Sequence, residues 1–259
     1  MTKLSRRVFL GSAPAAAAAA GIFGTFFSTA AEAAIKWNET YNVIVIGAGG
    51  AGLSAAVSAK EAGAKKVVVL EKMMFAGGNT IRAGGGFNAA IKADYEKAGI
   101  TDSPKLHAQQ TLAAGDGRGD PVLVHQLAEK APESVQWLKD HGVKFQDHIY
   151  QIYGGLYKRA RNPIGPRGGA YIKALLEVCK KEDIPILCNT RVVEIIREHQ
   201  LSGRVLGVKV EQKGGKTLYL RATNAVVAAA GGFAANDRLT AISDPRMGQL
   251  GTTNHPGAT

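Results

Sequence analysis

The feature that most constrains the fold is a glycine pattern between two short apolar segments near the N-terminus. Residues 42–46 have the composition of a buried strand and run directly into Gly47-Ala48-Gly49-Gly50-Ala51-Gly52. An alanine-rich helix is expected from about Leu53 to Ala62, and a second strand from Lys66 to Leu70 ends at Glu71. This order of strand, glycine turn, helix and strand forms a βαβ unit, which predicts an α/β fold built on a parallel sheet.

Each glycine of this motif has a separate physical role. Gly47 allows a tight turn, Gly49 allows the backbone to approach a pyrophosphate, and Gly52 allows the helix to pack close to the strand. The helix N-terminus presents free N–H groups and a positive dipole end to phosphates. Glu71, 19 residues after the third glycine, can accept a hydrogen bond from a ribose hydroxyl. The motif alone is weak evidence, but this context predicts a dinucleotide site.

A second glycine run follows soon after the acidic residue. Residues 77–86 contain five glycines, and such density indicates that the backbone must come close to a flat or phosphorylated group. A mobile surface loop is the alternative interpretation. A nicotinamide cofactor does not require a second run of this kind, whereas a flavin must be held along its ribityl chain and ring. The spacing therefore favours FAD over NAD.

The first 33 residues have the features of an export signal. Ser5-Arg6-Arg7-Val8-Phe9-Leu10 is a twin-arginine pattern, and a weakly apolar alanine-rich run follows it. Ala31-Glu32-Ala33 offers a cleavage site, which places the start of the mature chain at Ala34. A membrane anchor is the less favoured alternative, because the run is only modestly hydrophobic. We expect export to the periplasm by the twin-arginine route, with no stable membrane insertion after cleavage.

From about Tyr41 onward the chain resembles the fumarate reductase and succinate dehydrogenase flavoproteins, most closely the soluble periplasmic flavocytochrome c branch. The resemblance depends on the first glycine motif, Glu71-Lys72, Gly77-Gly78-Asn79, residues 83–89, Ala229-Ala230-Gly231-Gly232-Phe233 and residues 253–259. It implies a Rossmann-like FAD-binding domain over residues 34–259, in three layers, with a parallel sheet and an antiparallel β-meander. The family normally continues past Thr259 with a capping domain and a C-terminal segment, so this domain is expected to be incomplete at its C-terminus.

The resemblance also implies roles for individual residues. Membrane-bound members have a flavin-linked His where this chain has Asn79, so FAD is expected to be held without a covalent bond. Gly84 and Gly85 are placed against the flavin near N5, with Gly85 next to the substrate, and Val192 or Val193 is placed where backbone contacts the adenine. The complete set of expected cofactor contacts is Gly47, Gly49, Gly50, Ala51, Gly52, Glu71, Lys72, Gly78, Asn79, Thr80, Gly84, Gly85, Val192, Val193, Ala229 and Gly231.

The implied activity is hydride transfer from flavin N5 to the C=C bond of a small unsaturated carboxylic acid such as fumarate, methacrylate or urocanate. The chain contains no Cys-x-x-Cys-His motif, so electrons are expected from a separate c-type cytochrome. No residue matches the family's proton-donating Arg or its carboxylate-binding His and Arg, which the resemblance places after Thr259. Residues 1–259 alone are therefore expected to be inactive. The alternatives are another flavoenzyme of the superfamily, of the 3-ketosteroid dehydrogenase or aspartate oxidase type, or a non-catalytic flavin-binding polypeptide.

The remaining sequence predicts ordinary α/β scaffolding. Helices are expected at 122–141, broken at Pro132, and at 169–181, and strands at 186–188, 192–197, 205–212, 217–220 and 225–228. The two cysteines, Cys179 in a helix and Cys188 in a strand, are expected to be buried thiols rather than a disulfide.

Charge and histidine placement limit the remaining function classes. The net charge is +11, but no basic helix with interleaved aromatic residues is present, so nucleic-acid binding is not expected. The loop 157–167 carries four cations and is expected either to attract a carboxylate or redox partner or to be simply solvated. The six histidines have no metal-ligand spacing, and no metal site is predicted.

Overall fold

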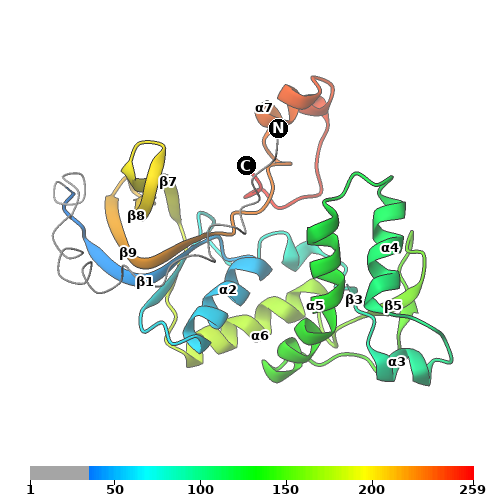
Figure 1. Ribbon diagram of the computed structural model, residues 1–259. Helices are drawn as coiled ribbons and strands as arrows, with labels where there is room; N and C mark the ends of the chain where they lie inside the picture. The colour runs from blue at the N-terminus through cyan, green and yellow to red at the C-terminus, as the bar shows by residue number, and fades with distance from the viewer. Residues whose placement is uncertain (1–34) are drawn as a thin grey trace, which may run out of the picture.

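The computed structural model describes residues 35–259 and is built around a six-stranded sheet (Figure 1). The strand order is β6-β2-β1-β9-β8-β7, in which β6, β2, β1 and β9 are parallel and β9, β8 and β7 form an antiparallel meander. The strands are β1 (Glu39–Ile46), β2 (Val67–Leu70), β6 (Ile186–Leu187), β7 (Thr190–His199), β8 (Ser202–Gln212) and β9 (Thr217–Ala228). The predicted combination of a parallel sheet with a β-meander is confirmed.

Two helices cover one face of the parallel strands. They are α2 (Gly50–Glu61) and α6 (Gly168–Lys181), and they lie beside each other below the sheet in Figure 1. Val43 and Val45 of β1 point to this face and pack against Leu53 of α2 and Leu175 of α6. Successive strand residues point to opposite faces, so Ile44 contributes instead to a second core with residues of β8 and β9. The sheet is therefore buried between a helical layer and the meander.

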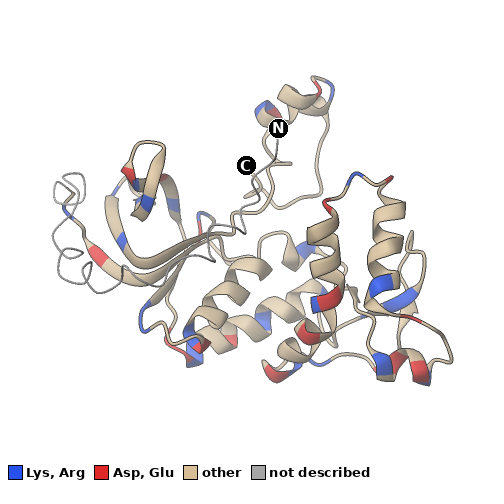
Figure 2. Ribbon diagram, in the orientation of Figure 1, with Lys and Arg blue, Asp and Glu red and all other residues tan. Residues whose placement is uncertain are grey.

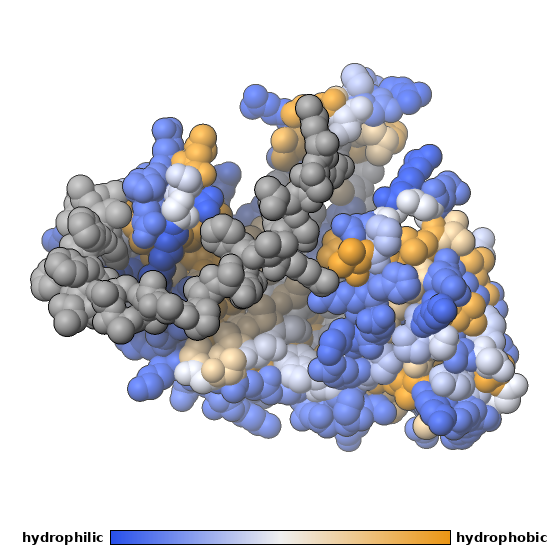
Figure 3. All heavy atoms as spheres, in the orientation of Figure 1, coloured by the Kyte–Doolittle hydropathy of each residue, from blue (hydrophilic) through white to orange (hydrophobic). Residues whose placement is uncertain are grey.

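A smaller region lies beside the sheet and carries the other helices. It contains the three-stranded sheet β3 (Phe87–Asn88), β5 (Lys158–Arg161) and β4 (Tyr150–Gln151), together with α3 (Lys92–Lys97), α4 (Pro104–Ala114) and α5 (Pro121–Asp140). The N-terminal turns of α5 expose apolar residues, seen as orange atoms in Figure 3. Charges of both signs are interspersed over this region (Figure 2). The short 3₁₀ turn η2 (Thr80–Arg82) lies in the second glycine run, and after β9 the chain forms α7 (Asp237–Ser243) and the 3₁₀ turn η3 (Met247–Gln249).

The basic loop 157–167 is not simply solvated, which was one of the two interpretations of its four cations. Arg159 and Arg161 lie in β5 and are 5% and 4% exposed. Arg159 pairs with Asp102, and Arg161 pairs with Asp94. These two cations therefore stabilise the small region, and only Lys158 and Arg167 of the original four remain exposed.

Two predicted interruptions of secondary structure are wrong. Helix α5 runs without a break through Pro132, because Ala128, Ala131, Val135 and Leu138 form a continuous buried stripe along it. This burial compensates for the hydrogen bond that a proline inside a helix cannot donate. The separate strands expected at 217–220 and 225–228 are one strand, β9, whose pairing with β1 shifts register between Tyr41 and Val43. An irregularity in register is thus found where a gap between two strands was expected.

The cysteines differ in their surroundings more than the sequence predicted. Both are free thiols, and Cys179 is buried in α6, but Cys188 follows β6 rather than lying in it and is only partly buried. Burial raises the pKa of Cys179 from 9.0 to about 11. Because only the thiolate reacts, we expect alkylation of Cys179 at pH 8 to be about 100-fold slower than that of an unshifted thiol.

Timed alkylation with mass spectrometry checks this expectation. Cys188 provides an internal comparison and should react first, although burial and the Glu71 charge also raise its pKa. Equal reaction rates of the two thiols in the native protein would contradict the prediction, whereas equal rates in urea are expected.

Candidate functional site

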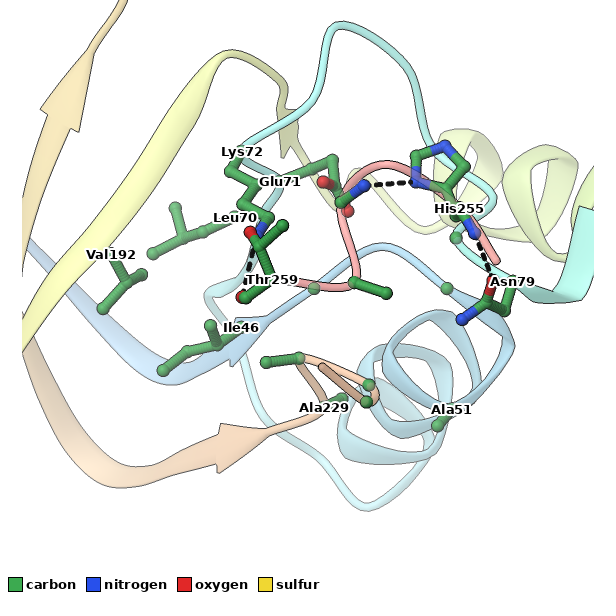
Figure 4. Close-up of a pocket in the computed structure, with 18 of the residues that line it drawn as sticks. Ile46, Ala51, Leu70, Glu71, Lys72, Asn79, Val192, Ala229, His255 and Thr259 are labelled. Carbon is green, nitrogen blue, oxygen red and sulfur yellow. Dashed lines mark hydrogen bonds between the residues drawn. The ribbon is translucent and has the colours of Figure 1, made fainter. Parts of the chain in front are cut away.

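A cavity of about 310 Å³ lies at the carboxyl ends of β1, β2 and β9 (Figure 4). Parallel α/β sheets bind ligands at this edge, because the loops that follow the strands diverge there. The strands contribute Ile46 and Leu70 to the cavity wall, and the turn after β9 contributes Ala229. The expected contacts that line the cavity are Gly47, Gly49, Gly50, Ala51, Glu71, Lys72, Gly78, Asn79, Thr80, Val192, Ala229 and Gly231.

The two glycine runs, predicted separately, meet at this cavity. Gly49 and Gly77 form an isolated parallel bridge, and the Gly77 N–H donates to the Ala48 carbonyl at 2.9 Å. A Cβ on Gly78 would lie 3.2 Å from the Gly49 Cα, and Gly78 has φ +51°. A side chain at this point would therefore separate the two runs and occupy the space between them.

The N-terminus of α2 opens onto the same cavity. Its first residues, Gly50 and Ala51, line the wall, so the helix begins inside the glycine motif rather than at Leu53. The N-cap residue, Gly49, has no side chain that could cap the helix, and no acidic residue lies in the first turn. The positive end of the helix dipole is thus left for an anionic ligand.

Three polar side chains expected to contact a cofactor also hold the backbone of the site together. The buried Glu71 carboxylate accepts from the Ala48 N–H and the Met73 N–H, both at 2.9 Å. Asn79 Oδ1 accepts from the His255 N–H at 2.6 Å, and Thr80 Oγ1 accepts from the Gly50 N–H at 3.1 Å. Each retains capacity for a ligand, since a carboxylate oxygen can accept twice and the Asn79 amide and Thr80 hydroxyl can still donate.

Two cations stand at the rim near the ribose acid. Lys72 and Arg191 both line the cavity, and Lys72 Nζ donates to the carbonyl of Thr259 at 3.1 Å. Burial, and next the positive charge of Arg191, lower the pKa of Lys72, while Glu71 acts in the opposite direction. The positive charge of Lys72 and Arg191 therefore favours binding of a negatively charged group at the rim.

Four of the expected contacts do not line the cavity. Gly52 lies behind it, where a Cβ would be 1.8 Å from the Gly47 carbonyl oxygen, so its role is the close packing of α2 on β1. Gly84 and Gly85 lie further along the second run, and a Cβ on Gly85 would meet Arg167 and Gly168 at the start of α6. Val193 is 39% exposed at a bulge in β7, whereas its neighbour Val192 faces the cavity.

Several lining residues carry no cofactor signal in the sequence. Thr190 and Arg191 enter through the start of β7, which the Thr190 N–H joins to the Glu71 carbonyl at 2.8 Å. The C-terminal segment also lines the cavity, through His255, Gly257, Ala258 and Thr259. This segment is one of those through which the chain resembles the flavoprotein family. The buried His255 ring accepts from the Gly257 N–H at its Nδ1 (Figure 4). The same ring meets the Phe75 ring edge-on, with 5.6 Å between ring centroids. These residues become neighbours only through long-range contacts, which local sequence patterns do not predict.

Comparison with known proteins settles the family. A family model described as an FAD binding domain matches residues 42–259. The chain belongs to this family. Fumarate reductase (cytochrome) from Shewanella frigidimarina is 37% identical over 223 residues, which cover 85% of this chain and 38% of that protein. The resemblance to fumarate reductase flavoproteins is therefore confirmed for this FAD-binding domain.

Other relatives carry different names. The acrylate reductase flavoprotein subunit of Shewanella woodyi is 32% identical over 264 residues, 99% of this chain and 52% of that protein. NADH:fumarate oxidoreductase from Klebsiella pneumoniae is 37% identical and is covered over only 24% of its length. The chain thus spans about a quarter to about half of the length of these curated relatives.

Solved structures agree on the fold. A flavocytochrome c3 fumarate reductase in an open conformation superposes with a TM-score of 0.80 at 32% identity, covering 86% of this chain and 39% of that one. A 3-ketosteroid-Δ4-(5α)-dehydrogenase from Rhodococcus jostii RHA1 gives 0.77 at 26% identity, covering 87% and 53%. The Rossmann-like α/β architecture of the FAD-binding domain is therefore shown.

The cavity fits the cofactor that the family implies. Its wall is made of backbone segments packed so closely that they leave no room for added Cβ atoms. At Gly47, for example, a Cβ would lie 2.4 Å from the Ala229 carbonyl oxygen. An uncapped helix end, a buried carboxylate and two rim cations match a pyrophosphate flanked by a ribose. Within residues 35–259 no cluster of metal-ligating side chains occurs. In the same part of the chain, no helix combines the length and apolarity that crossing a bilayer requires. The twin-arginine signal predicted at 1–33 lies outside the described residues.

Proposed function

We propose that this chain is the FAD-binding part of a periplasmic reductase that saturates the C=C bond of a small unsaturated carboxylic acid. The observation that carries the proposal is the cavity, where both glycine runs, the α2 N-terminus and Glu71 converge in a chain of the FAD-binding family. Relatives named for fumarate, acrylate and urocanate support the substrate class, because all three acids carry a C=C bond conjugated to a carboxylate.

The residues of the domain have distinct proposed tasks. The N–H groups at Gly49 and Ala51 receive the pyrophosphate, and Glu71 accepts from the ribose. Lys72 and Arg191 neutralise charge at the rim. The remaining expected contacts hold the adenine (Val192, Val193), the ribityl chain (Gly78, Asn79, Thr80), the ring (Gly84, Gly85) and the turn geometry (Gly47, Gly52, Ala229, Gly231).

Bound FAD would supply two-electron hydride chemistry, which no side chain of the domain provides. Asn79 would leave the attachment non-covalent, since a carboxamide lacks the nucleophilic ring nitrogen with which a histidine bonds to a flavin. Electrons are proposed to come from a c-type cytochrome, in line with the relative named as a cytochrome-linked fumarate reductase. The other source is NADH, for which a second relative is named.

The test begins with the protein purified from the periplasm of its own cells. We expect one FAD that is released on denaturation, and oxidation of a reduced viologen dye when fumarate, acrylate, methacrylate or urocanate is added. Replacing the dye by reduced cytochrome c or by NADH identifies the donor. Absence of flavin, or a flavin that stays attached to the denatured chain, would contradict the cofactor proposal.

A 3-ketosteroid dehydrogenase activity is the second candidate. It is favoured by the TM-score of 0.77 with the Rhodococcus jostii enzyme. Reduction of a dye in the presence of a 3-ketosteroid, with no response to any unsaturated acid, would establish it in place of the reductase.

Ala51→Glu tests the pyrophosphate position without disturbing the fold. Ala51 is exposed in the first turn of α2, where a carboxylate is favourable for the helix, so stability should stay the same or rise. The same carboxylate repels a pyrophosphate, and we expect FAD affinity to fall by about 10- to 100-fold. Isothermal titration of the flavin-free protein measures the change. Ala51→Gln is the uncharged control and should lose far less; an equal loss in both variants would point to a steric effect instead.

A further inference from the structure

The glycine run at Gly84–Gly86 is held from behind by the N-terminal turn of α6. The Gly168 N–H donates to the Ala83 carbonyl at 3.1 Å, and a Cβ on Gly168 would lie 1.9 Å from the Thr80 carbonyl oxygen. A Cβ on Gly85 would meet the carbonyl carbon of Arg167 at 2.8 Å. The run and the helix end are therefore in backbone contact, with no side chain between them.

One side chain of α6 reaches the run directly. The hydroxyl of Tyr171 donates to the Gly85 carbonyl at 2.7 Å, and both residues are buried. Phe87 and Phe145 pack against the Tyr171 ring, with centroids at 6.4 and 6.0 Å. Burial, with a smaller contribution from Tyr150, raises the pKa of Tyr171 well above its usual range. The phenol thus remains protonated and able to donate at every physiological pH.

This hydrogen bond fixes the orientation of a peptide plane. In a trans peptide the C=O of one residue and the N–H of the next point in opposite directions, and no cis peptide occurs in the described residues. With its C=O bound to Tyr171, the Gly85–Gly86 peptide directs the Gly86 N–H away from α6. Within residues 35–259 this N–H has no hydrogen-bond partner. Glycines on both sides would otherwise allow the plane to rotate, and Gly85 already has φ +88°.

We propose that Tyr171 is a positioning residue of the flavin site, which locks the Gly85–Gly86 peptide so that the Gly86 N–H is presented to the cofactor. The inference rests on the proposed function, which places this run beside the flavin ring. A reduced flavin carries more negative charge than an oxidised one, and a fixed N–H stabilises such charge without reorganisation. Loss of the lock should therefore weaken binding of reduced FAD more than binding of oxidised FAD.

Tyr171→Phe in the FAD-loaded protein tests the inference. Dissociation constants for oxidised and reduced FAD are measured separately, and their ratio does not depend on activity. One lost neutral hydrogen bond predicts a shift of roughly 3- to 10-fold in that ratio, against reduced FAD. Tyr150→Phe is the matched control, because its phenol lies beside Gly86 but donates to the Asn162 side chain. An unchanged ratio in folded Tyr171→Phe, or the same shift in the control, would overturn the inference.

A second pair of variants covers the case in which phenylalanine leaves a hole that prevents folding. Replacement of Tyr171 by 4-fluorophenylalanine fills the space of the hydroxyl without a donor and should shift the ratio as Phe would. Replacement by 4-aminophenylalanine restores a donor and should bring the ratio back toward wild type. Identical ratios in these two variants would refute the role of the hydrogen bond. A wild-type protein that binds FAD in neither state overturns the proposed function itself, whereas wild-type binding with unaltered ratios overturns only the role of Tyr171.

Discussion

Gly52→Ala is expected to destabilise the protein by about 3 kcal/mol or more and to abolish FAD binding. In an isolated helix the same change is favourable by about 1 kcal/mol, because alanine loses less backbone entropy than glycine. Here the sign is reversed, since the new Cβ would lie 1.8 Å from the Gly47 carbonyl oxygen. Relief requires α2 to move off β1, which opens the cavity wall between them.

Denaturant unfolding and flavin titration measure the two effects. Gly169→Ala is the matched control: it lies in the first turn of α6, and its Cβ would meet only the Pro166 ring at 3.3 Å and the Ile81 side chain at 3.7 Å. We expect the control to retain stability and FAD binding. A Gly52→Ala protein as stable as the control would show that α2 and β1 are not as tightly apposed as the structure places them.

Asp102→Asn is expected to destabilise the protein by about 3–5 kcal/mol, because it leaves a buried guanidinium without its counter-charge. The side chains of Arg159 and Asp102 are 5% and 1% exposed, and two hydrogen bonds of 3.1 and 2.9 Å join them. Arginine cannot deprotonate to escape the penalty. Burial, and next the Arg159 charge, lower the pKa of His107 beside the pair, so at neutral pH this histidine adds no second positive charge to the site.

The same chemical change at an exposed pair provides the control. Asp244→Asn removes the partner of Arg246, whose side chain is 89% exposed, and little change in unfolding free energy is expected because water solvates both groups. The double variant Asp102→Leu with Arg159→Met should recover much of the loss, as buried pairs replaced by apolar groups often do. A double variant less stable than Asp102→Asn would contradict the explanation by an unpaired buried charge.

The sequence predicted the part of the site that is made of backbone. Gly47, Gly52 and Gly78 were identifiable because only glycine permits their close approach to neighbouring backbone or their φ. The tasks of the polar side chains were only half predicted. Glu71, Asn79 and Thr80 also accept from backbone N–H groups 23, 176 and 30 residues away, and local spacing says nothing of these partners.

The errors of the sequence interpretation have the same origin. Pro132 indicated a helix break, but a buried stripe along α5 outweighs one missing hydrogen bond. Arg159 and Arg161 could be interpreted from the sequence as solvated cations. In the structure they lie in β5, where they pair with Asp102 and Asp94. In each case a local preference worth a few kcal/mol at most was overruled by burial against residues distant in the sequence.

The sequence by itself determined the βαβ unit and its parallel strands, because glycine spacing and apolar runs are local constraints at each position. The meander and the FAD-binding family were implied by the resemblance that the motifs carry. Only the tertiary structure decided that the two glycine runs form one wall, that residues 255–259 close the other, and that Tyr171 lies behind Gly85. These contacts join segments that lie tens to hundreds of residues apart. They exist because the sheet brings the carboxyl ends of its strands together at one edge, and the packing of α6 then selects which side chains reach that edge.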